Sequence, residues 1–225
     1  MKYVWFLLLF CLCIGQHTPP EDVLTGSDVH LPQPSFKGNM SVEEALRMRR
    51  SVRDFEDTML SLEQVSQLLW AGQGITEGVK RAAPSAGATY PLTLYVVAGE
   101  NGIDGLPAGV YEYIPKTHSL VLVKEGDSRQ EIVKACLNQY FIGDAPISIV
   151  IAAEYMRTTV QYGERGIRYV HMEAGHVGEN IYLQAVSLNL GTVVVGAFLD
   201  VDLQKVLDLP NKQVPLYVMP VGYQA

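Results

Sequence analysis

Cysteine and positive charge are both scarce in this sequence. The 225 residues include 3 cysteines, of which Cys11 and Cys13 lie in an apolar N-terminal segment. Cys136 alone cannot form an internal disulfide, and without a nearby histidine or metal-ligand spacing it is best interpreted as a small buried residue of a helix. Lys and Arg total 17 against 24 acidic residues, a formal net charge of -7. Such a balance argues against nucleic acid as a partner, because phosphate binding relies on extended basic surfaces.

Several signatures of cofactor and metal sites are also absent. The chain contains no Gly-x-x-x-x-Gly-Lys-Ser, Gly-x-Gly-x-x-Gly, Cys-x-x-Cys or His-Glu-x-x-His pattern. These absences remove the usual support for P-loop nucleotide, Rossmann dinucleotide and zinc sites. What the chain does contain is 48% apolar and 18% charged residues. That composition is enough for one domain with a sizeable core.

The N-terminus has the pattern of an export signal. Segment 1–15, MKYVWFLLLFCLCIG, places one lysine before an apolar run that is short for a membrane-spanning helix. We expect a signal peptide cleaved after Gly15 and an exported protein; the alternative is an uncleaved N-terminal anchor, which would then be the protein's membrane attachment. Residues 16–40 contain four prolines and show no periodicity. They predict a linker or extended arm before a domain over 41–225.

Capping signals and apolar periodicity predict the elements of this domain. Capping boxes at Ser41–Glu44 and Ser61–Gln64 begin helices that end near Arg49 and Gly72. Strands and helices do not alternate regularly, so the fold class is α+β. The other predicted elements are strands at 92–98, 110–114, 120–123, 147–153, 192–195 and 216–221, and helices at 128–137, 166–190 and 201–207.

Three stretches have compositions that packing alone does not explain. Segment 47–53, Arg-Met-Arg-Arg-Ser-Val-Arg, is equally consistent with a salt-bridged surface and with a phosphate clamp. The small residues of 82–91 form either a tight surface loop or a place where a flat ligand approaches the backbone. In 191–198, Gly196 and Ala197 follow a buried strand and leave backbone amides at its end.

The long predicted helix carries a group of polar side chains. His171, Glu173, His176 and Asn180 have spacings that suit either metal binding or acid/base chemistry. A helix packed at an interface usually satisfies such groups internally, so we favour a structural role.

Taken in order, these stretches resemble the FMN-dependent nitroreductase family, and within it the SagB-type dehydrogenases, relatives of the azoline oxidases of peptide biosynthesis. The resemblance rests on Arg-Arg-Ser-Val-Arg-Asp-Phe, Pro-Ser-Ala-Gly-Ala-Thr-Tyr-Pro, Glu-Ala-Gly-His-Val-Gly-Glu-Asn, Val-Val-Gly-Ala-Phe and Val-Met-Pro-Val-Gly-Tyr. It implies a nitroreductase-like α+β fold with a central, mostly antiparallel sheet flanked by helices. It also implies an intertwined homodimer with one FMN at each end of its interface.

The resemblance assigns roles to individual residues. Arg49, Arg50 and Ser51 match positions that hold the FMN phosphate and ribityl chain. Arg53 matches the basic position near flavin N1 and the C2 carbonyl, where a guanidinium stabilises the negative charge of the reduced ring. Arg53 and Gly196 are thus the predicted catalytic residues, and no metal is expected. The remaining cofactor-binding residues are the backbone facing flavin N5, Gly196 and Ala197, and a small-residue segment that the partner chain supplies in this family, Pro84, Ser85, Ala86 and Gly87.

The resemblance leaves the substrate and the electron donor open. NAD(P)H is the usual donor, but an exported enzyme would lack it, which favours another donor or the dehydrogenation of a small-molecule or peptide-derived substrate. Azoline-oxidising relatives carry a Lys-Tyr pair, whereas Gln161 precedes Tyr162 here, and glutamine cannot act as a general base. Tyr90 fits a substrate-side lid and a core residue equally well. A flavin-binding protein without turnover is the remaining alternative.

Overall fold

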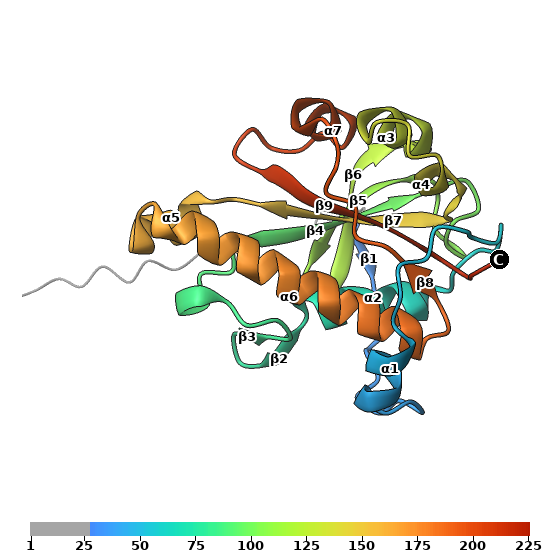
Figure 1. Ribbon diagram of the computed structural model, residues 1–225, viewed down its shortest axis with the longest axis horizontal. Coiled ribbons are helices and arrows are strands. Elements are labelled where there is room, and N and C mark those ends of the chain that lie inside the picture. Colours follow the sequence, from blue (N-terminus) through green and yellow to red (C-terminus); the bar gives the residue numbers. More distant parts are fainter. Residues whose placement is uncertain (1–27) are drawn as a thin grey trace, which may run out of the picture.

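The computed structural model describes residues 28–225, so the predicted signal peptide or anchor at 1–15 and the arm up to residue 27 lie outside the described residues. A seven-stranded antiparallel sheet with the order β1-β6-β5-β4-β7-β9-β8 forms the centre (Figure 1). The predicted α+β class with a mostly antiparallel sheet is confirmed. The strands are β1 Asp28–His30, β4 Leu92–Ala98, β5 Gly109–Ile114, β6 Ser119–Glu125, β7 Ile147–Ala153, β8 Gly191–Thr192 and β9 Val214–Gly222, with a separate hairpin of β2 Ile75–Glu77 and β3 Lys80–Arg81.

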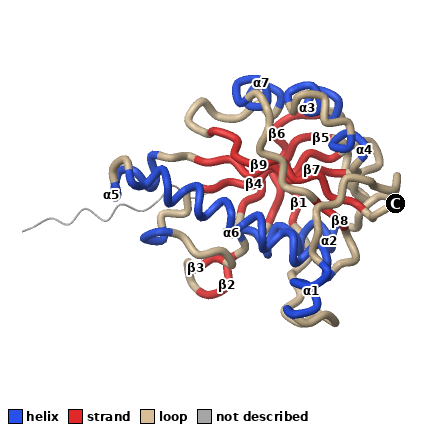
Figure 2. Tube along the Cα trace, in the orientation of Figure 1, coloured by secondary structure: helices blue, strands red, loops and turns tan. Residues whose placement is uncertain are grey.

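Helices cover both faces of the sheet (Figure 2). On β4, Leu94 and Val96 belong to the core shared with α2 and α6, whereas Tyr95 and Val97 belong to the core shared with α3 and α7. This alternation is the period of a strand whose two faces are both buried, which explains its continuous apolar sequence. The helices are α1 Val42–Met48, α2 Leu62–Gln73, α3 Arg129–Ala135, α4 Phe141–Asp144, α5 Met156–Tyr162, α6 Arg165–Ser187 and α7 Asp200–Val206, with a 3₁₀ turn η1 at Ala86–Ala88.

Helix α6 is the longest element and determines where the candidate site residues lie. Its 23 residues span roughly 35 Å at 1.5 Å per residue. The helix α5 and the turn η1 lie near its N-terminal end, and α1 and β8 lie near its C-terminal end (Figure 1). Val170, Val177 and Ile181 are completely buried along its inner face. Segments that contact opposite ends of α6 are therefore far apart within one chain.

Both predicted capping boxes are present. Ser41 accepts a hydrogen bond from the Glu44 N–H while the Glu44 side chain accepts from the Ser41 N–H, and Ser61 and Gln64 do the same at α2. Among residues 28–225, no helix combines the length and the apolar character needed to cross a membrane.

The arm predicted to lack a strand does form one in its last part. Residues Asp28–His30 pair antiparallel with 119–121 of β6, and the Leu31 N–H donates to the His118 carbonyl at 3.0 Å. A three-residue edge strand is too short to show periodicity, so only its partner defines it. The predicted strand 192–195 is shorter than expected, because β8 ends at Thr192 and Val195 then makes an isolated bridge with Val218.

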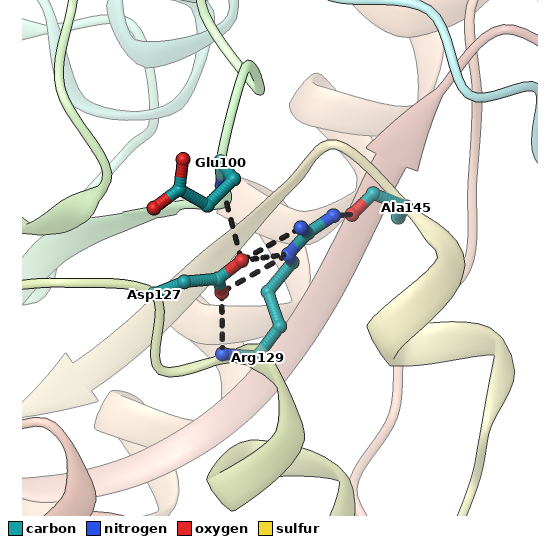
Figure 3. Close-up of polar contacts among 4 residues, drawn as sticks. All are labelled: Glu100, Asp127, Arg129 and Ala145. Atoms are coloured by element: carbon teal, nitrogen blue, oxygen red, sulfur yellow. Dashed lines mark hydrogen bonds and ion pairs between the residues drawn. The ribbon is translucent and has the colours of Figure 1, made fainter.

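An ion pair joins the loops at one end of the sheet (Figure 3). Asp127 accepts bonds from Arg129 Nε at 3.1 and 3.0 Å and from Arg129 Nη2 at 2.7 Å, and it accepts from the backbone N–H groups of Arg129 and Glu100 at 3.0 Å each. Arg129 also donates to the Ala145 carbonyl at 3.3 Å. Burial acts to raise the pKa of Asp127, but the bonds from Arg129 and Glu100 outweigh it and the net shift is downward. The ionised carboxylate is therefore the form that the fold stabilises.

Replacing Asp127 with Asn should lower the free energy of unfolding at neutral pH by about 2 kcal/mol, because a charge-assisted bond is lost and Arg129 is left without its counter-ion. A group with a depressed folded-state pKa stabilises the fold above its unfolded-state pKa, and this contribution is lost as the pH falls through the folded-state value. The difference from wild type should thus shrink in acid. Urea unfolding checks it, with the exposed Asp104→Asn as control; equal stability of Asp127→Asn and wild type at pH 7 would contradict it.

Candidate functional site

Tyr182 joins two of the three stretches selected from the sequence. The hydroxyl of this buried α6 residue accepts a bond from the Val194 N–H at 2.8 Å and lies 3.2 Å from Ser51 Oγ. The guanidinium carbon of Arg49 is 5.1 Å from the centre of the Tyr182 ring. One side chain thereby fixes the arginine segment beside the chain that leads to Gly196. Tyr182 was not among the site residues predicted from the sequence. The feature that could have indicated it is a polar hydroxyl group on the apolar face of a helix.

The arginine segment runs beside β8 in extended form. Ser51 forms a parallel bridge with Thr192, and the Val52 N–H donates to the Thr192 carbonyl at 2.9 Å. Val52 is buried while Ser51 and Arg53 are exposed, as expected from the alternating sides of extended chain. Arg53 lies with its guanidinium carbon 5.8 Å from the centre of the Phe141 ring. The segment therefore presents Ser51 and Arg53 toward solvent.

Arg50 has different surroundings from Arg49. Its Nε donates to the Met48 carbonyl at 3.0 Å. Arg50 lines a cavity of about 340 Å³ together with Val52, Tyr182 and Gln224. Within residues 28–225, neither Arg49 nor Arg53 makes an ion pair with an acidic group. The two guanidinium groups remain available to an anion.

The turn at Gly196 and Ala197 is exposed at the end of a paired segment. Val195 exchanges two backbone bonds with Val218, at 2.8 and 2.9 Å, and the Gln139 amide donates to the Ala197 carbonyl at 2.9 Å. No hydrogen bond within the described part of the chain uses the N–H of Gly196 or of Ala197. The turn is thus held by its carbonyl side and offers two backbone donors.

The small-residue segment contains a run of left-handed backbone. Gly87 has φ 59°, Ala88 has φ 52° and Tyr90 has φ 45°. Such values are uncommon for residues with a Cβ and cost about 1 kcal/mol or more each, so surrounding contacts must hold them. Pro84 and Gly87 are exposed, while Ser85 and Ala86 are partly buried.

Tyr90 receives most of these contacts. Its N–H donates to Ser85 Oγ at 3.0 Å, and its carbonyl accepts from Arg157 Nη1 at 3.2 Å. The guanidinium carbon of Arg81 lies 4.5 Å from the centre of its ring. These three contacts hold Tyr90 in place, so of the two roles left open they favour a packed residue over a substrate-side lid.

The Gln161-Tyr162 pair lies against the same turn. A Cβ built on Gly87 would lie 2.5 Å from the Tyr162 hydroxyl and 2.9 Å from Gln161 Oε1. Gln161 Nε2 also donates to the Tyr162 hydroxyl at 3.3 Å. Glycine at 87 is therefore needed for this close approach as well as for its positive φ.

The polar side chains of α6 do not converge. Asn180 donates to the Ala71 carbonyl at 3.0 Å, His171 Nε2 lies 2.6 Å from the Tyr155 hydroxyl, and His176 is exposed. Residues 28–225 contain no cluster of three His, Cys, Asp or Glu side chains suited to a metal ion. Cys136 is buried, and burial raises the pKa of its thiol to about 12, so it is not a thiolate nucleophile at neutral pH.

The predicted site residues form two groups. Arg49, Ser51 and Val194, which leads to the Gly196 turn, meet around Tyr182, whereas the small-residue segment contacts α5 and the first half of α6. Tyr182 follows Glu173, the α6 residue beneath that segment, by nine positions, roughly 13 Å along the helix. One chain does not bring the two groups together.

An antiparallel α+β core that carries arginines without acidic partners and free backbone N–H groups at a strand end is found in a family of oxidoreductases. Residues 46–223 match the Nitroreductase family, and the chain belongs to that family. The protein MJ1384 of Methanocaldococcus jannaschii, named a nitroreductase, is 46% identical over 199 residues, which cover 88% of this chain and 98% of that protein.

Two further relatives show the range of the similarity. A crystal structure of a nitroreductase-like protein from Ralstonia eutropha superposes with a TM-score of 0.77 at 29% identity, covering 92% of this chain and 95% of that one. The microcin B17-processing protein McbC of Escherichia coli is 24% identical over 183 residues, covering 78% of this chain and 67% of McbC.

Proposed function

We propose that this protein is an FMN-dependent oxidoreductase of the SagB-type branch. The observation that carries the proposal is the group around Tyr182, whose ring contacts the unpaired Arg49 and whose hydroxyl binds the N–H of Val194, two residues before the free N–H of Gly196. Nitroreductase family proteins generally use FMN. A phosphate needs cations, and a flavin ring that takes up electrons needs donors. The residues present fit both needs.

Each residue has a physical task in this proposal. Arg49 and Ser51 would bind the phosphate and ribityl chain, with Arg50 adding positive charge, because charge-assisted hydrogen bonds are about twice as strong as neutral ones. Arg53 would stabilise negative charge near N1 and C2, and Gly196 and Ala197 would donate at N5. Bound FMN supplies the reversible two-electron acceptance that couples a donor half-reaction to an acceptor half-reaction.

The second group of residues requires a partner copy. Pro84, Ser85, Ala86 and Gly87 lie too far along α6 to meet Arg49 of the same chain, so we propose a homodimer in which each site takes this segment from the other subunit. Large apolar side chains that are exposed in the single chain, on helices at both ends of α6, support an interface that would cover them. They are Val42 and Leu46 on α1, Val160 on α5 and Met172 on α6.

The electron donor and the cellular location of the protein are also part of the proposal. NAD(P)H is the donor generally used by the family, whereas export through segment 1–15 would favour oxidation of a small-molecule or peptide-derived substrate.

The visible spectrum of the purified protein tests the main proposal, because bound oxidised flavin makes it yellow. A protein that stays colourless after addition of FMN would refute flavin binding. Anaerobic mixing with NADH or NADPH then tests the donor by bleaching.

Replacing Arg53 with Ala should slow flavin reduction at least about tenfold while changing FMN affinity much less, because its charge acts on the reduced ring. Stopped-flow absorbance measures the rate and fluorescence titration measures the affinity. Arg53→Lys keeps the charge and should recover part of the rate. An unchanged rate in Arg53→Ala would show that this guanidinium does not face the reacting ring.

A second candidate is azoline dehydrogenation in peptide modification. It is supported by the similarity to McbC, named a microcin B17-processing protein, and by the position of Gln161 and Tyr162 against the small-residue turn. Glutamine lacks the basicity of lysine, so Tyr162 would have to move the proton. Conversion of a thiazoline peptide by the wild type, and its loss in Tyr162→Phe, would support this reaction. Failure of the wild type to convert such a peptide would remove it.

A further inference from the structure

Helix α3 ends in a backbone turn that usually contains glycine. The Leu137 N–H donates to the Lys134 carbonyl at 3.2 Å. The Asn138 N–H donates to the Val133 carbonyl at 2.9 Å, and these are the two bonds of a Schellman motif. Leu137 occupies its left-handed position with φ 58°, and Asn138 follows with φ 61°. A bulky residue at positive φ is an outlier, and strained positions of this kind cluster at functional sites. This strained turn places the next residue, Gln139.

The side chain of Gln139 joins the end of α3 to the segment that follows β8. Its Nε2 donates to the Cys136 carbonyl and to the Ala197 carbonyl, both at 2.9 Å. Because both partners are carbonyl oxygens, only the NH₂ end of the side-chain amide can face them, and it has one hydrogen for each. The Leu199 N–H donates to the Ala135 carbonyl at 2.9 Å and forms a second link between the two segments. The end of α3 therefore holds this segment through two separate bonds.

The same short stretch of chain also contacts Arg53. Phe141 follows Gln139 by two residues, and the centre of its ring lies 5.8 Å from the guanidinium carbon of Arg53. An aromatic ring at this distance attracts a guanidinium group. One stretch of chain thus contacts both Arg53 of the arginine segment and Ala197 of the Gly196 turn. The two are connected through the residues that lead from α3 to α4.

The bond to the Ala197 carbonyl bears on the peptide group that precedes it. A peptide group is planar, so a hydrogen bond to its carbonyl also fixes the direction of its N–H. The Val218 N–H donates to the Val195 carbonyl at 2.9 Å, which fixes the N–H of Gly196. The N–H of Ala197 belongs to the following peptide group, and Gly196 has no Cβ to restrict rotation before it. The direction of this second N–H therefore depends on the bond beyond it, from Gln139.

We propose that Gln139 is a positioning residue that holds the peptide group between Gly196 and Ala197, so that the Ala197 N–H keeps one direction. Without it, the next bond along the chain is that of the Leu199 N–H, two residues further on, and the peptide group is free to rotate. This effect on the backbone is independent of any cofactor. Its consequence for the flavin rests on the proposed function, which places this N–H at N5, where an oriented donor needs no reorganisation during the reaction.

Backbone order parameters, measured by ¹⁵N relaxation NMR on the full chain without FMN, test the inference. The Ala197 amide should be rigid in the wild type, with an order parameter of about 0.85, and should fall below about 0.6 in Gln139→Met. Methionine keeps the unbranched shape of glutamine but donates no hydrogen bond. The Gly196 amide should change much less, because Val195 holds its peptide group. Gln130→Met makes the same substitution at an exposed position of α3 and should behave as wild type.

A second variant separates the lost donor from a general loosening of the loop. Gln139→Lys keeps a side-chain donor and should recover most of the order of the Ala197 amide. The inference is overturned if this amide is equally rigid in the wild type and in Gln139→Met. It is also overturned if Gly196 loses as much order as Ala197, or if Gln139→Lys is as mobile as Gln139→Met.

Addition of saturating FMN distinguishes the inference from the proposed function. In the wild type, the Ala197 amide proton should move downfield as it forms a hydrogen bond to the flavin, and in Gln139→Met this shift should be at least halved. A protein that binds no FMN but shows the expected order parameters refutes the proposed function alone. One that binds FMN while Gln139→Met keeps the wild-type order at Ala197 refutes the inference alone.

Discussion

Replacing Arg49 with Ala is expected to weaken FMN binding by about 10- to 100-fold. Arg49 is half-buried against the Tyr182 ring and has no acidic partner among residues 28–225, so its charge is both oriented and available. A charge-assisted hydrogen bond to phosphate contributes about 1.5–3 kcal/mol, which corresponds to that range of affinity. Titration of the apo-protein with FMN, followed by quenching of flavin fluorescence, measures the change.

Two further variants separate the charge from its support. Arg47→Ala removes an exposed arginine from the last turn of α1 and should leave affinity nearly unchanged. Tyr182→Phe keeps the ring beneath Arg49 but removes the hydroxyl group that binds Ser51 and Val194, so a smaller loss of affinity is expected. If Arg47→Ala and Arg49→Ala lose equal affinity, the arginine run acts through general charge and Tyr182 does not orient a clamp.

Replacing Glu173 with Gln is expected to change the free energy of unfolding differently in acid and in mildly alkaline solution. The variant should gain about 3 kcal/mol over the wild type between the two conditions. Burial raises the pKa of Glu173 from 4.5 to about 7, and each pKa unit corresponds to about 1.4 kcal/mol. A carboxyl group with a raised folded-state pKa contributes stability that is present below its unfolded-state pKa and is lost as the pH rises through the folded-state value. Glutamine has no such loss.

The pH window follows from those two values. The advantage of Glu173→Gln over wild type should grow between pH 4.5 and about 7 and stay constant above this. Urea unfolding at several pH values measures it, with Glu179→Gln as the control on the exposed side of α6. A constant difference across the window would mean that Glu173 has an ordinary pKa in the folded protein.

The elements predicted correctly are those whose signals are local. The boundaries of β4 and β7 match their largely apolar runs at 92–98 and 147–153, because a strand buried on both faces needs apolar side chains at most of its positions. The starts of α1 and α2 follow from side chains three residues apart.

The elements that were missed depend on distant partners. The sequence of α5, Met156–Tyr162, exposes Met156 and Val160 and has no side-chain cap, so neither periodicity nor capping indicated a helix. Its hydrogen bond between Thr158 and Thr89 at 2.8 Å joins residues far apart in the chain. Strand β1 and the β2–β3 hairpin are likewise defined by pairing rather than by composition.

The amino-acid sequence by itself determined the α+β class, the principal strands and helices, and the identity of the chemical groups, because these follow from local periodicity and side-chain chemistry. Only the tertiary structure decided that Tyr182 joins the arginine segment to Val194 before the Gly196 turn, that the small-residue segment lies near the other end of α6, and that Glu173 is buried. Those relations depend on which faces of α6 meet α1, α2 and the sheet, and packing between distant segments sets them.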